Sequence, residues 1–245
     1  MRSAVRGAGA AALALGLGVA VAACSSGAGV RSGAAEDFGD SRPAEVRAVA
    51  DPGGLAGVPA RVDGAVVTVG DADAPHTVRV YEDARCPYCK KFEEGGARAL
   101  VGPVADGDVK VEYTIASFLD KNLGGSGSVN AANALRASVD AGKFPEFHAA
   151  VFANQPDDES VDAYTDAFLL KVADTVDGLR SDAFDRAVND GSYETWVDDA
   201  MRAFRDDGVR GTPTVLIDGK KAGGGEDAMY GQTSFAAVLK DAGIG

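Results

Sequence analysis

Histidine and cysteine are scarce in this chain, which has 245 residues but two histidines and three cysteines. A zinc site takes about four ligands, most often from these two residue types. Cys86 and Cys89 form the one close pair, while His76, His148 and Cys24 show no paired spacing. The sequence therefore disfavours a zinc site, and we expect neither a metal nor a cofactor.

Positive charge is also in short supply. Lysine and arginine together number 24 against 37 aspartates and glutamates, which gives a net charge of −13 at pH 7. Nucleic acids and anionic membrane surfaces attract basic proteins and repel acidic ones. The composition therefore argues against a nucleic-acid partner and against direct binding to a membrane surface by charge.

Long apolar runs are missing, apart from one near the N-terminus. Residues 8–20 are all Ala, Gly, Leu or Val, and Arg2 and Arg6 precede them. A membrane-spanning helix needs about 20 apolar residues, so this shorter run is typical of an export signal. The run leads into the sequence VAAC at residues 21–24, which resembles a bacterial lipobox.

The lipobox resemblance implies a signal peptide over residues 1–23 and a lipid on Cys24, the first residue after cleavage. Ordinary cleavage after small residues, with Cys24 incidental, is the alternative. If Cys24 carries lipid, Cys86 and Cys89 are the remaining thiols, and an oxidising compartment suits a working disulfide between them. We therefore expect an extracytoplasmic protein that meets the membrane through its lipid anchor only.

The segment after the leader has little with which to build a core. Residues 24–58 are rich in Gly, Ala and Ser and carry few large apolar side chains. Such a segment cannot bury enough surface to fold alone, so we predict a flexible tether with a span of roughly 30 Å. Residues 59–245 are numerous enough for one domain with its own core, which we expect to be monomeric.

The two remaining thiols stand at the start of an expected helix. Residues 77–81 predict a strand, Cys86-Pro87-Tyr88-Cys89 follow, and a helix is predicted from Pro87 to about residue 100. A helix N-terminus favours a thiolate, the species that exchanges disulfides, so the spacing indicates a redox pair. A purely structural disulfide is the alternative, but it would close a very short loop and restrict the unfolded chain little.

The rest of the pattern predicts strands, then helices, then strands again. Strands are expected at 65–69 and 109–115, and another at 214–217 after a helical middle. The dipeptide Asp218-Gly219 predicts a tight hairpin to an edge strand at 220–222. Apolar stripes predict helices over residues 129–139, 144–151, 161–172, 184–188, 193–204 and 233–239.

The starts of several helices are also readable. Pro145 is expected in the first turn of one helix. Ser160 is expected to cap another, and Thr233 or Ser234 to cap the last.

This order resembles the thioredoxin fold of the DsbA-like thiol–disulfide oxidoreductases, a family of exported proteins. The resemblance rests on residues 81–94 (YEDARCPYCKKFEE) and residues 208–214 (GVRGTPT). It implies an α/β fold, a central mixed sheet flanked by helices, with a helical insertion at about 121–204 between a βαβ half and a ββα half. It also implies that the Thr212–Pro213 bond is cis and lies beside the cysteines, where the backbone can pair with an extended substrate. A trans proline in an ordinary turn is the alternative.

The resemblance also implies a role for each residue of the motif. Cys86 is expected to be the exposed, acidic sulfur that forms the mixed disulfide, and Cys89 the resolving partner one turn deeper. Pro87 helps to hold the turn and lacks an N–H that would be unpaired there anyway. Tyr88 occupies the position that tunes the pair. The strongest oxidants of the family often have histidine there, so we expect a weaker oxidant.

One position departs from the family. Thioredoxin and many DsbA-like proteins have a buried acid six residues before the first cysteine, where this chain has Val80. Glu82 and Asp83 are nearer to the cysteines and could assist proton transfer, but we interpret them as strand-end charges in water. His148 is expected to be a partly buried helix residue without a redox role, and His76 a loop residue.

Three functions are compatible with these features. The first is a membrane-tethered oxidase that introduces disulfides into exported proteins and is re-oxidised by an integral membrane thiol oxidase. The second is a reductase or isomerase that uses the same cysteines. The third is a tethered binding or holdase module in which the disulfide is structural.

Overall fold

The computed structural model describes residues 45–48, 54–225 and 227–245. The expected signal peptide, Cys24 and most of the expected tether lie outside these residues. Among the helices of the described part, none is both long enough and apolar enough to cross a membrane.

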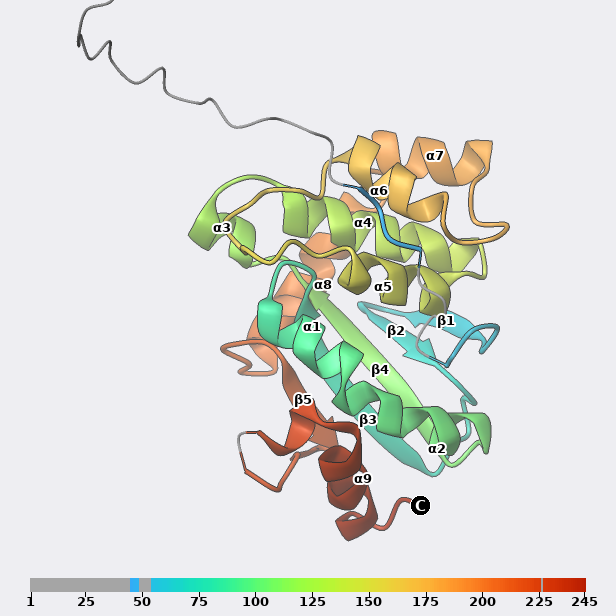
Figure 1. The fold of residues 1–245 in the computed structure, drawn as a ribbon, viewed down its shortest axis with the longest axis vertical. Coiled ribbons are helices and arrows are strands. Elements are labelled where there is room, and N and C mark those ends of the chain that lie inside the picture. The colour runs from blue at the N-terminus through green and yellow to red at the C-terminus, as the bar shows by residue number, and fades with distance from the viewer. Residues whose placement is uncertain (1–44, 49–53, 226) are drawn as a thin grey trace, which may run out of the picture. The chain divides into compact units, whose positions relative to one another are not determined.

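A mixed sheet forms the centre of the fold (Figure 1). Six strands of the described chain pair in the order β1-β2-β4-β3-β5-β6. The central strands β3 and β4 are parallel, and every other pairing is antiparallel. The strands are β1 (Ala60–Asp63), β2 (Val66–Val69), β3 (His76–Asp83), β4 (Val109–Ala116), β5 (Thr214–Ile217) and β6 (Lys220–Lys221).

Helices cover both faces of this sheet, and most of them lie between β4 and β5 in the sequence. The first group comprises α1 (Pro87–Glu94), the 3₁₀ turn η1 (Gly96–Leu100) and α2 (Val101–Ala105). The middle group comprises α3 (Leu119–Leu123), α4 (Gly127–Asp140), α5 (Phe144–Ala153), α6 (Asp166–Ala173), α7 (Asp182–Asn189) and α8 (Glu194–Asp206). The last elements are the 3₁₀ turn η2 (Ala228–Tyr230) and α9 (Gln232–Asp241).

Aromatic contacts show how the layers are joined. On one face, Phe92 of α1 meets Phe235 of α9 edge to face, with ring centroids 5.5 Å apart. On the other face, Tyr81 of β3 meets Phe204 of α8 at 6.2 Å. Buried aromatic pairs of this kind contribute about 1 kcal/mol beyond the burial of their area.

The expected fold class is confirmed. A βαβ half (β3-α1-β4) and a ββα half (β5-β6-α9) share the sheet, with the helical insertion between them, as in the thioredoxin fold. The predicted Asp218-Gly219 hairpin is also confirmed, because both residues have positive φ, 48° and 78°, and join the paired residues Ile217 and Lys220. His76 does not lie in a loop. It begins β3, and its Nδ1 is 2.8 Å from the Asp218 carboxylate.

The first strand was not predicted. β1 forms a hairpin with β2 in which Asp63 pairs with Val66 across Gly64 and Ala65. Gly64 has φ 57°, a conformation that favours glycine. Gly64, at the first position of the two-residue loop, is the signal that could have revealed this turn.

The helix that follows the cysteines is shorter than predicted. It was expected to run to about residue 100, but α1 ends at Glu94 and a 3₁₀ turn follows. The helix ends because Gly95, a poor helix former, has non-helical angles of φ −121° and ψ −87°. A Cβ at Gly95 would collide with the carbonyl of Tyr230, and one at Gly96 with that of Met229. Two glycines allow η2 to lie directly on the chain at this point.

Two predicted helix caps are wrong. Ser160 does not cap α6, because it lies in a turn and that helix begins only at Asp166. The N-cap is Thr165, whose hydroxyl accepts from the N–H of Phe168. The last helix is capped by neither Thr233 nor Ser234 but begins after Gly231. Ser181 caps α7, with its hydroxyl accepting from the N–H of Phe184, and this cap was not predicted.

A short piece of the expected tether contacts the insertion. The side-chain amide of Asn154, just after α5, accepts from the backbone N–H of Arg47 at 2.6 Å and donates to its carbonyl at 2.9 Å. Val46 and Leu55 pack against the core.

The cap of α6 can be tested directly. Thr165→Ala removes the acceptor for the Phe168 N–H and is expected to lower the free energy of unfolding by about 1 kcal/mol. Ser160→Ala is the matched control, because the Ser160 hydroxyl bonds only within an exposed turn. Urea unfolding followed by circular dichroism measures both. Equal losses for the two variants would contradict the assignment of Thr165 as the cap.

Candidate active site

The two cysteines lie where β3 leads into α1. Cys86 is the N-cap residue of α1, with φ −74° and ψ 118°, and Pro87 is the first helical residue. Cys89 is completely buried and Cys86 is 6% exposed. The expectation that Cys86 is exposed is therefore wrong. The reason is that Leu119 of α3 and Phe152 of α5, both from the insertion, pack against the pair.

Cys86 is the more acidic thiol. Its hydrogen bond with the Cys89 side chain lowers the pKa of Cys86 to about 7, while burial acts in the opposite direction. Thr212 and the backbone N–H groups of Cys89 and Tyr88 lower this pKa further. Those N–H groups belong to the first turn of the helix, and that of Cys89 also donates to the carbonyl oxygen of Cys86 at 3.0 Å. Near neutral pH a large fraction of Cys86 is therefore thiolate.

Cys89 has the opposite tendency. Burial raises the pKa of the Cys89 thiol well above its usual value, and the hydrogen bond with Cys86 and the nearby Glu82 add to this effect. Cys89 is therefore protonated near neutral pH. The pair combines one thiolate that can attack or leave with one thiol that holds a proton.

The loop before β5 stands beside the first cysteine. The Thr212–Pro213 peptide bond is cis, and the carbonyl oxygen of Thr212 lies 3.3 Å from the Sγ of Cys86. The structure therefore brings together the two segments that carry the sequence resemblance, although 126 positions separate Cys86 from Thr212.

Tyr88 projects from the first turn of α1 and is 58% exposed. Its ring lies 6.0 Å from that of Tyr230, centroid to centroid, and the Nζ of Lys91 lies 4.6 Å from the Tyr230 ring centroid. Tyr230 comes from η2, the turn that rests on the end of α1. Sequence reasoning missed it because no local pattern relates residue 230 to residue 88.

A buried acidic cluster beneath α1 was also missed. Glu82 of β3 is completely buried, and its Oε1 lies 2.5 Å from the Nε2 of His148 on α5. The Nδ1 of His148 lies 3.8 Å from Glu93 of α1, whose side chain is 10% exposed. Glu82 is therefore not a solvated charge, and His148 is almost completely buried. The reason is that α5 of the insertion covers the end of β3.

Glu82 occupies the same face of β3 as Val80, because alternate residues of a strand point the same way. The buried acid of this chain therefore stands two residues nearer to the cysteines than the position at which the family pattern places one.

The acidic cluster holds protons near neutral pH. Burial raises the pKa of Glu82 well above its usual value and raises that of Glu93 to about 8. Burial also lowers the pKa of His148, which favours the neutral ring. Ligand atoms of the two carboxyl groups lie within 4.8 Å of each other, and the nearby Glu82 raises the pKa of Glu93 further.

Asp83 is likewise buried rather than solvated, with 0% exposure. Its carboxylate accepts from the Ser128 hydroxyl at 2.7 Å and from the N–H of Leu119 at 3.1 Å. Burial raises the pKa of Asp83 to about 6, against these hydrogen bonds. Asp83 thus attaches the end of β3 to α3 and α4.

Arg85 makes a second attachment immediately before the cysteines. Its side chain is 2% exposed and donates to Asp120 at 2.8 Å. It also donates to the carbonyls of Gly124 at 2.7 Å and Glu159 at 3.1 Å. One side chain therefore holds two loops of the insertion against the redox motif.

One group of possible metal ligands occurs among the described residues. Ligand atoms of Glu82, Glu93 and His148 lie within 4.8 Å of one another. Protons remain on the carboxyl groups near neutral pH, and Glu82 and His148 already satisfy each other at 2.5 Å. We therefore interpret the group as a proton-holding cluster.

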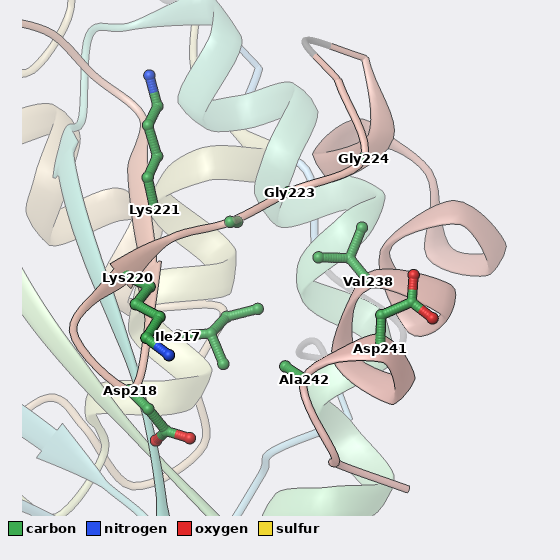
Figure 2. A pocket seen from close by; sticks show the side chains of 10 residues that line it. Ile217, Asp218, Lys220, Lys221, Gly223, Gly224, Val238, Asp241 and Ala242 are labelled. Carbon is green, nitrogen blue, oxygen red and sulfur yellow. The ribbon is translucent and has the colours of Figure 1, made fainter.

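A surface cavity of about 400 Å³ lies between the β5–β6 hairpin and α9 (Figure 2). Lys220 and Asp241 line it above an apolar wall that includes Ile217 and Val238. Neither cysteine lines this cavity, so it is separate from the redox site.

The proton held by Glu93 predicts a pH effect on stability. The pKa of Glu93 rises from 4.5 to about 8 on folding, so stability falls as pH increases between these values. Burial lowers the pKa of His148 below 6.5, so the contribution of His148 to stability instead rises with pH, up to about pH 6.5. Between pH 6.5 and 8 the free energy of unfolding of the wild type should therefore fall by about 2 kcal/mol more than that of Glu93→Gln.

Urea unfolding at these two pH values measures the difference, because contributions common to both proteins cancel. Glu94→Gln, at the exposed neighbouring position, is the control and should follow the wild type. A Glu93→Gln variant with the same pH dependence as the wild type would show that Glu93 is ionised in the fold.

Comparison with known proteins agrees with this geometry. Serine/threonine-protein kinase PknE of Mycobacterium tuberculosis is 31% identical over 117 residues, which are 45% of this chain and 20% of the kinase. The chain thus covers about a fifth of that relative. Disulfide bond formation protein D of Bacillus subtilis is 27% identical over 155 residues, 62% of this chain and 67% of that protein.

A solved structure is similar as well. MdbA, a thiol-disulfide oxidoreductase from Corynebacterium matruchotii, is 28% identical with a TM-score of 0.56, over 67% of this chain and 85% of that one. A family model described as thioredoxin matches residues 63–233, well over half of the chain. The match includes the cysteine pair, the insertion and the Thr212–Pro213 loop, and the chain therefore belongs to the thioredoxin family.

Proposed function

We propose that this protein is an extracytoplasmic, membrane-tethered disulfide oxidase that passes a Cys86–Cys89 disulfide to cysteine pairs of exported proteins. The observation that carries the proposal is the opposite acidity of two adjacent sulfurs beside the Thr212–Pro213 loop. Relatives named as a disulfide bond formation protein and as a thiol-disulfide oxidoreductase support it.

The first step of the reaction uses the disulfide form of the pair. A substrate thiolate attacks the sulfur of Cys86, a mixed disulfide forms, and the bond to Cys89 breaks. Cys89 leaves with the electron pair and takes up a proton, which its raised pKa favours.

The second step releases the product. The other substrate thiol, once deprotonated, attacks the substrate sulfur of the mixed disulfide, and Cys86 leaves as a thiolate. The low pKa of Cys86 makes it a good leaving group. The substrate has then lost two electrons and gained a disulfide, and the protein is reduced.

Glu82 is suited to donate the proton that Cys89 gains and to accept the proton that Cys89 later loses. It is near enough to affect the pKa of Cys89, and burial keeps its own carboxyl protonated near neutral pH. We assign it the role of proton donor and acceptor for the resolving cysteine, with Glu93 and His148 holding it in place.

The surface around the cysteines suits an unfolded protein as substrate. Three large apolar side chains of the described chain are strongly exposed: Tyr88, Leu123 and Val161. Tyr88 belongs to the motif itself. Leu123 ends α3 and Val161 lies in the loop before α6, each close in sequence to a carbonyl that Arg85 binds, that of Gly124 or of Glu159. Apolar surface of this kind binds extended segments before they fold.

The location of the protein follows from its N-terminal sequence. The expected signal peptide over 1–23 and a lipid on Cys24 would hold the domain at the outer face of the membrane, with residues 24–58 as the tether. An integral membrane thiol oxidase would restore the disulfide, and a monomer suffices for every step.

The cysteines give the sharpest test. In the chain from residue 25 onward, which contains every described residue, Cys86→Ala is expected to abolish oxidation of a dithiol peptide, because no mixed disulfide can form. Cys89→Ala should also fail to oxidise the peptide, because its Cys86 cannot form the internal disulfide. Given oxidised glutathione, however, its Cys86 thiolate should release one glutathione thiol and keep the other as a lasting mixed disulfide, since the resolving thiol is gone. Peptide oxidation and mass spectrometry measure both. Oxidation that persists in Cys86→Ala would refute the proposal.

The equilibrium with glutathione distinguishes an oxidase from a reductase. A potential above about −200 mV is expected for an oxidase, whereas a value near about −270 mV would indicate a reductase. A disulfide that glutathione cannot open would support a structural role.

A further inference from the structure

One side chain of the insertion holds the backbone of the redox motif. Gln155, just after α5, is 3% exposed. Its Nε2 donates to the carbonyl oxygen of Ala84 at 2.6 Å and to that of Cys86 at 3.0 Å. These two carbonyls lie on either side of the peptide bond that enters Cys86. The single side-chain amide of Gln155 therefore holds the backbone on both sides of the bond that leads into Cys86.

The main chain of Gln155 is tied to the same helix. The Nζ of Lys90, in the second turn of α1, donates to the carbonyl oxygen of Gln155 at 3.1 Å. The backbone N–H of Gln155 donates to Phe152, whose side chain packs against the cysteines. Gln155 is thus attached to α1, to the turn before it and to the apolar cover of the pair.

The amide also has a clear orientation. The two carbonyls can only accept, so the nitrogen of the Gln155 side chain must face them. Its Oε1 is buried and bonds to no group of the described chain. The side chain therefore makes its polar contacts to the motif through its nitrogen alone.

The conformation that these bonds hold is the one that matters for the sulfur. Cys86 is an N-cap residue with extended backbone angles, which point its side chain back at the first turn of the helix. The N–H groups of Tyr88 and Cys89 in that turn lower the pKa of the sulfur, although neither makes a cap hydrogen bond to it. A rotation of the Cys86 backbone would move the sulfur away from them and from the Thr212 carbonyl.

We propose that Gln155 is a positioning residue of thiol–disulfide exchange, which holds Cys86 in the N-cap conformation that aims its sulfur at the start of α1. The inference rests on the proposed function of Cys86. Gln155 does not touch the sulfur and acts through the Cys86 backbone.

The charges around the sulfur would be unchanged by a neutral substitution at this position. The titratable groups that interact with the Cys86 sulfur are Cys89 of α1, Glu82 of β3 and Tyr230 of η2. In the described part of the chain Gln155 hydrogen-bonds to none of these side chains. A change in the acidity of Cys86 would therefore report its position.

The test compares two neighbouring amides. Gln155→Met keeps the length of the side chain and removes its donor. Asn154→Leu is the matched control, because Asn154 is also buried and hydrogen-bonded but holds Arg47 and Ala150 rather than the motif. Both are made in the chain from residue 25 onward. The reduced proteins are alkylated with iodoacetamide from pH 4 to 9, with the modified cysteine identified by mass spectrometry.

We expect the alkylation rate of Cys86 at pH 5 in Gln155→Met to fall about threefold or more, which corresponds to a pKa higher by about half a unit. Asn154→Leu should lose stability but titrate like the wild type. A change below about 1.5-fold in Gln155→Met, together with lost stability, would show a merely structural role and overturn the proposal. If Gln155→Met does not fold, Gln155→Asn, whose amide is one methylene short, is judged by the same criterion.

The glutathione equilibrium separates this inference from the function on which it rests. A wild type that never exchanges with glutathione would refute the proposed function. A wild type that exchanges, with a Gln155→Met variant of unchanged titration and potential, would refute the positioning role alone.

Discussion

A thiolate held where water hardly reaches is the constraint on which the rest of this structure depends. Burial disfavours any charged group, so an acidic cysteine at 6% exposure must receive compensation from fixed dipoles. The first turn of α1 and the Cys89 thiol supply it. Because hydrogen bonds weaken steeply with misalignment, the compensation requires that β3, α1 and the Thr212 loop stay in register with one another.

The insertion is what makes this environment possible. A βαβ–ββα core alone would leave the end of β3 and the start of α1 open to solvent. Leu119 and Phe152 cover the sulfurs, His148 covers Glu82, and Arg85 is enclosed by two loops. The helices between β4 and β5 are therefore part of the redox site as much as a surface around it, and the acidity of both cysteines reflects their presence.

Local patterns in the sequence predicted those features of the fold that depend on residues close together in the chain. The cysteine spacing, the Asp218-Gly219 turn and the apolar stripes each depend on residues close together in the chain, and the structure contains the elements they indicate. The burial of Glu82 and Asp83 could not be predicted in this way. Both end β3 in a charged stretch, and the distant α4 and α5 remove them from water. Tyr230 and Gln155 were missed for the same reason, since their partners are far away in the sequence.

The pair of glycines after α1 has a consequence for how substitutions in this protein should be interpreted. Gly95 and Gly96 lie against the backbone of η2 so closely that no side chain fits between them. A survey of variants would find both positions intolerant and, because they follow the cysteine helix, could attribute the intolerance to chemistry. Its source is steric: the two halves of the fold meet there main chain to main chain. Sensitivity to substitution around this motif therefore measures contact between the halves as well as catalysis, and an assay of folding is needed to tell them apart.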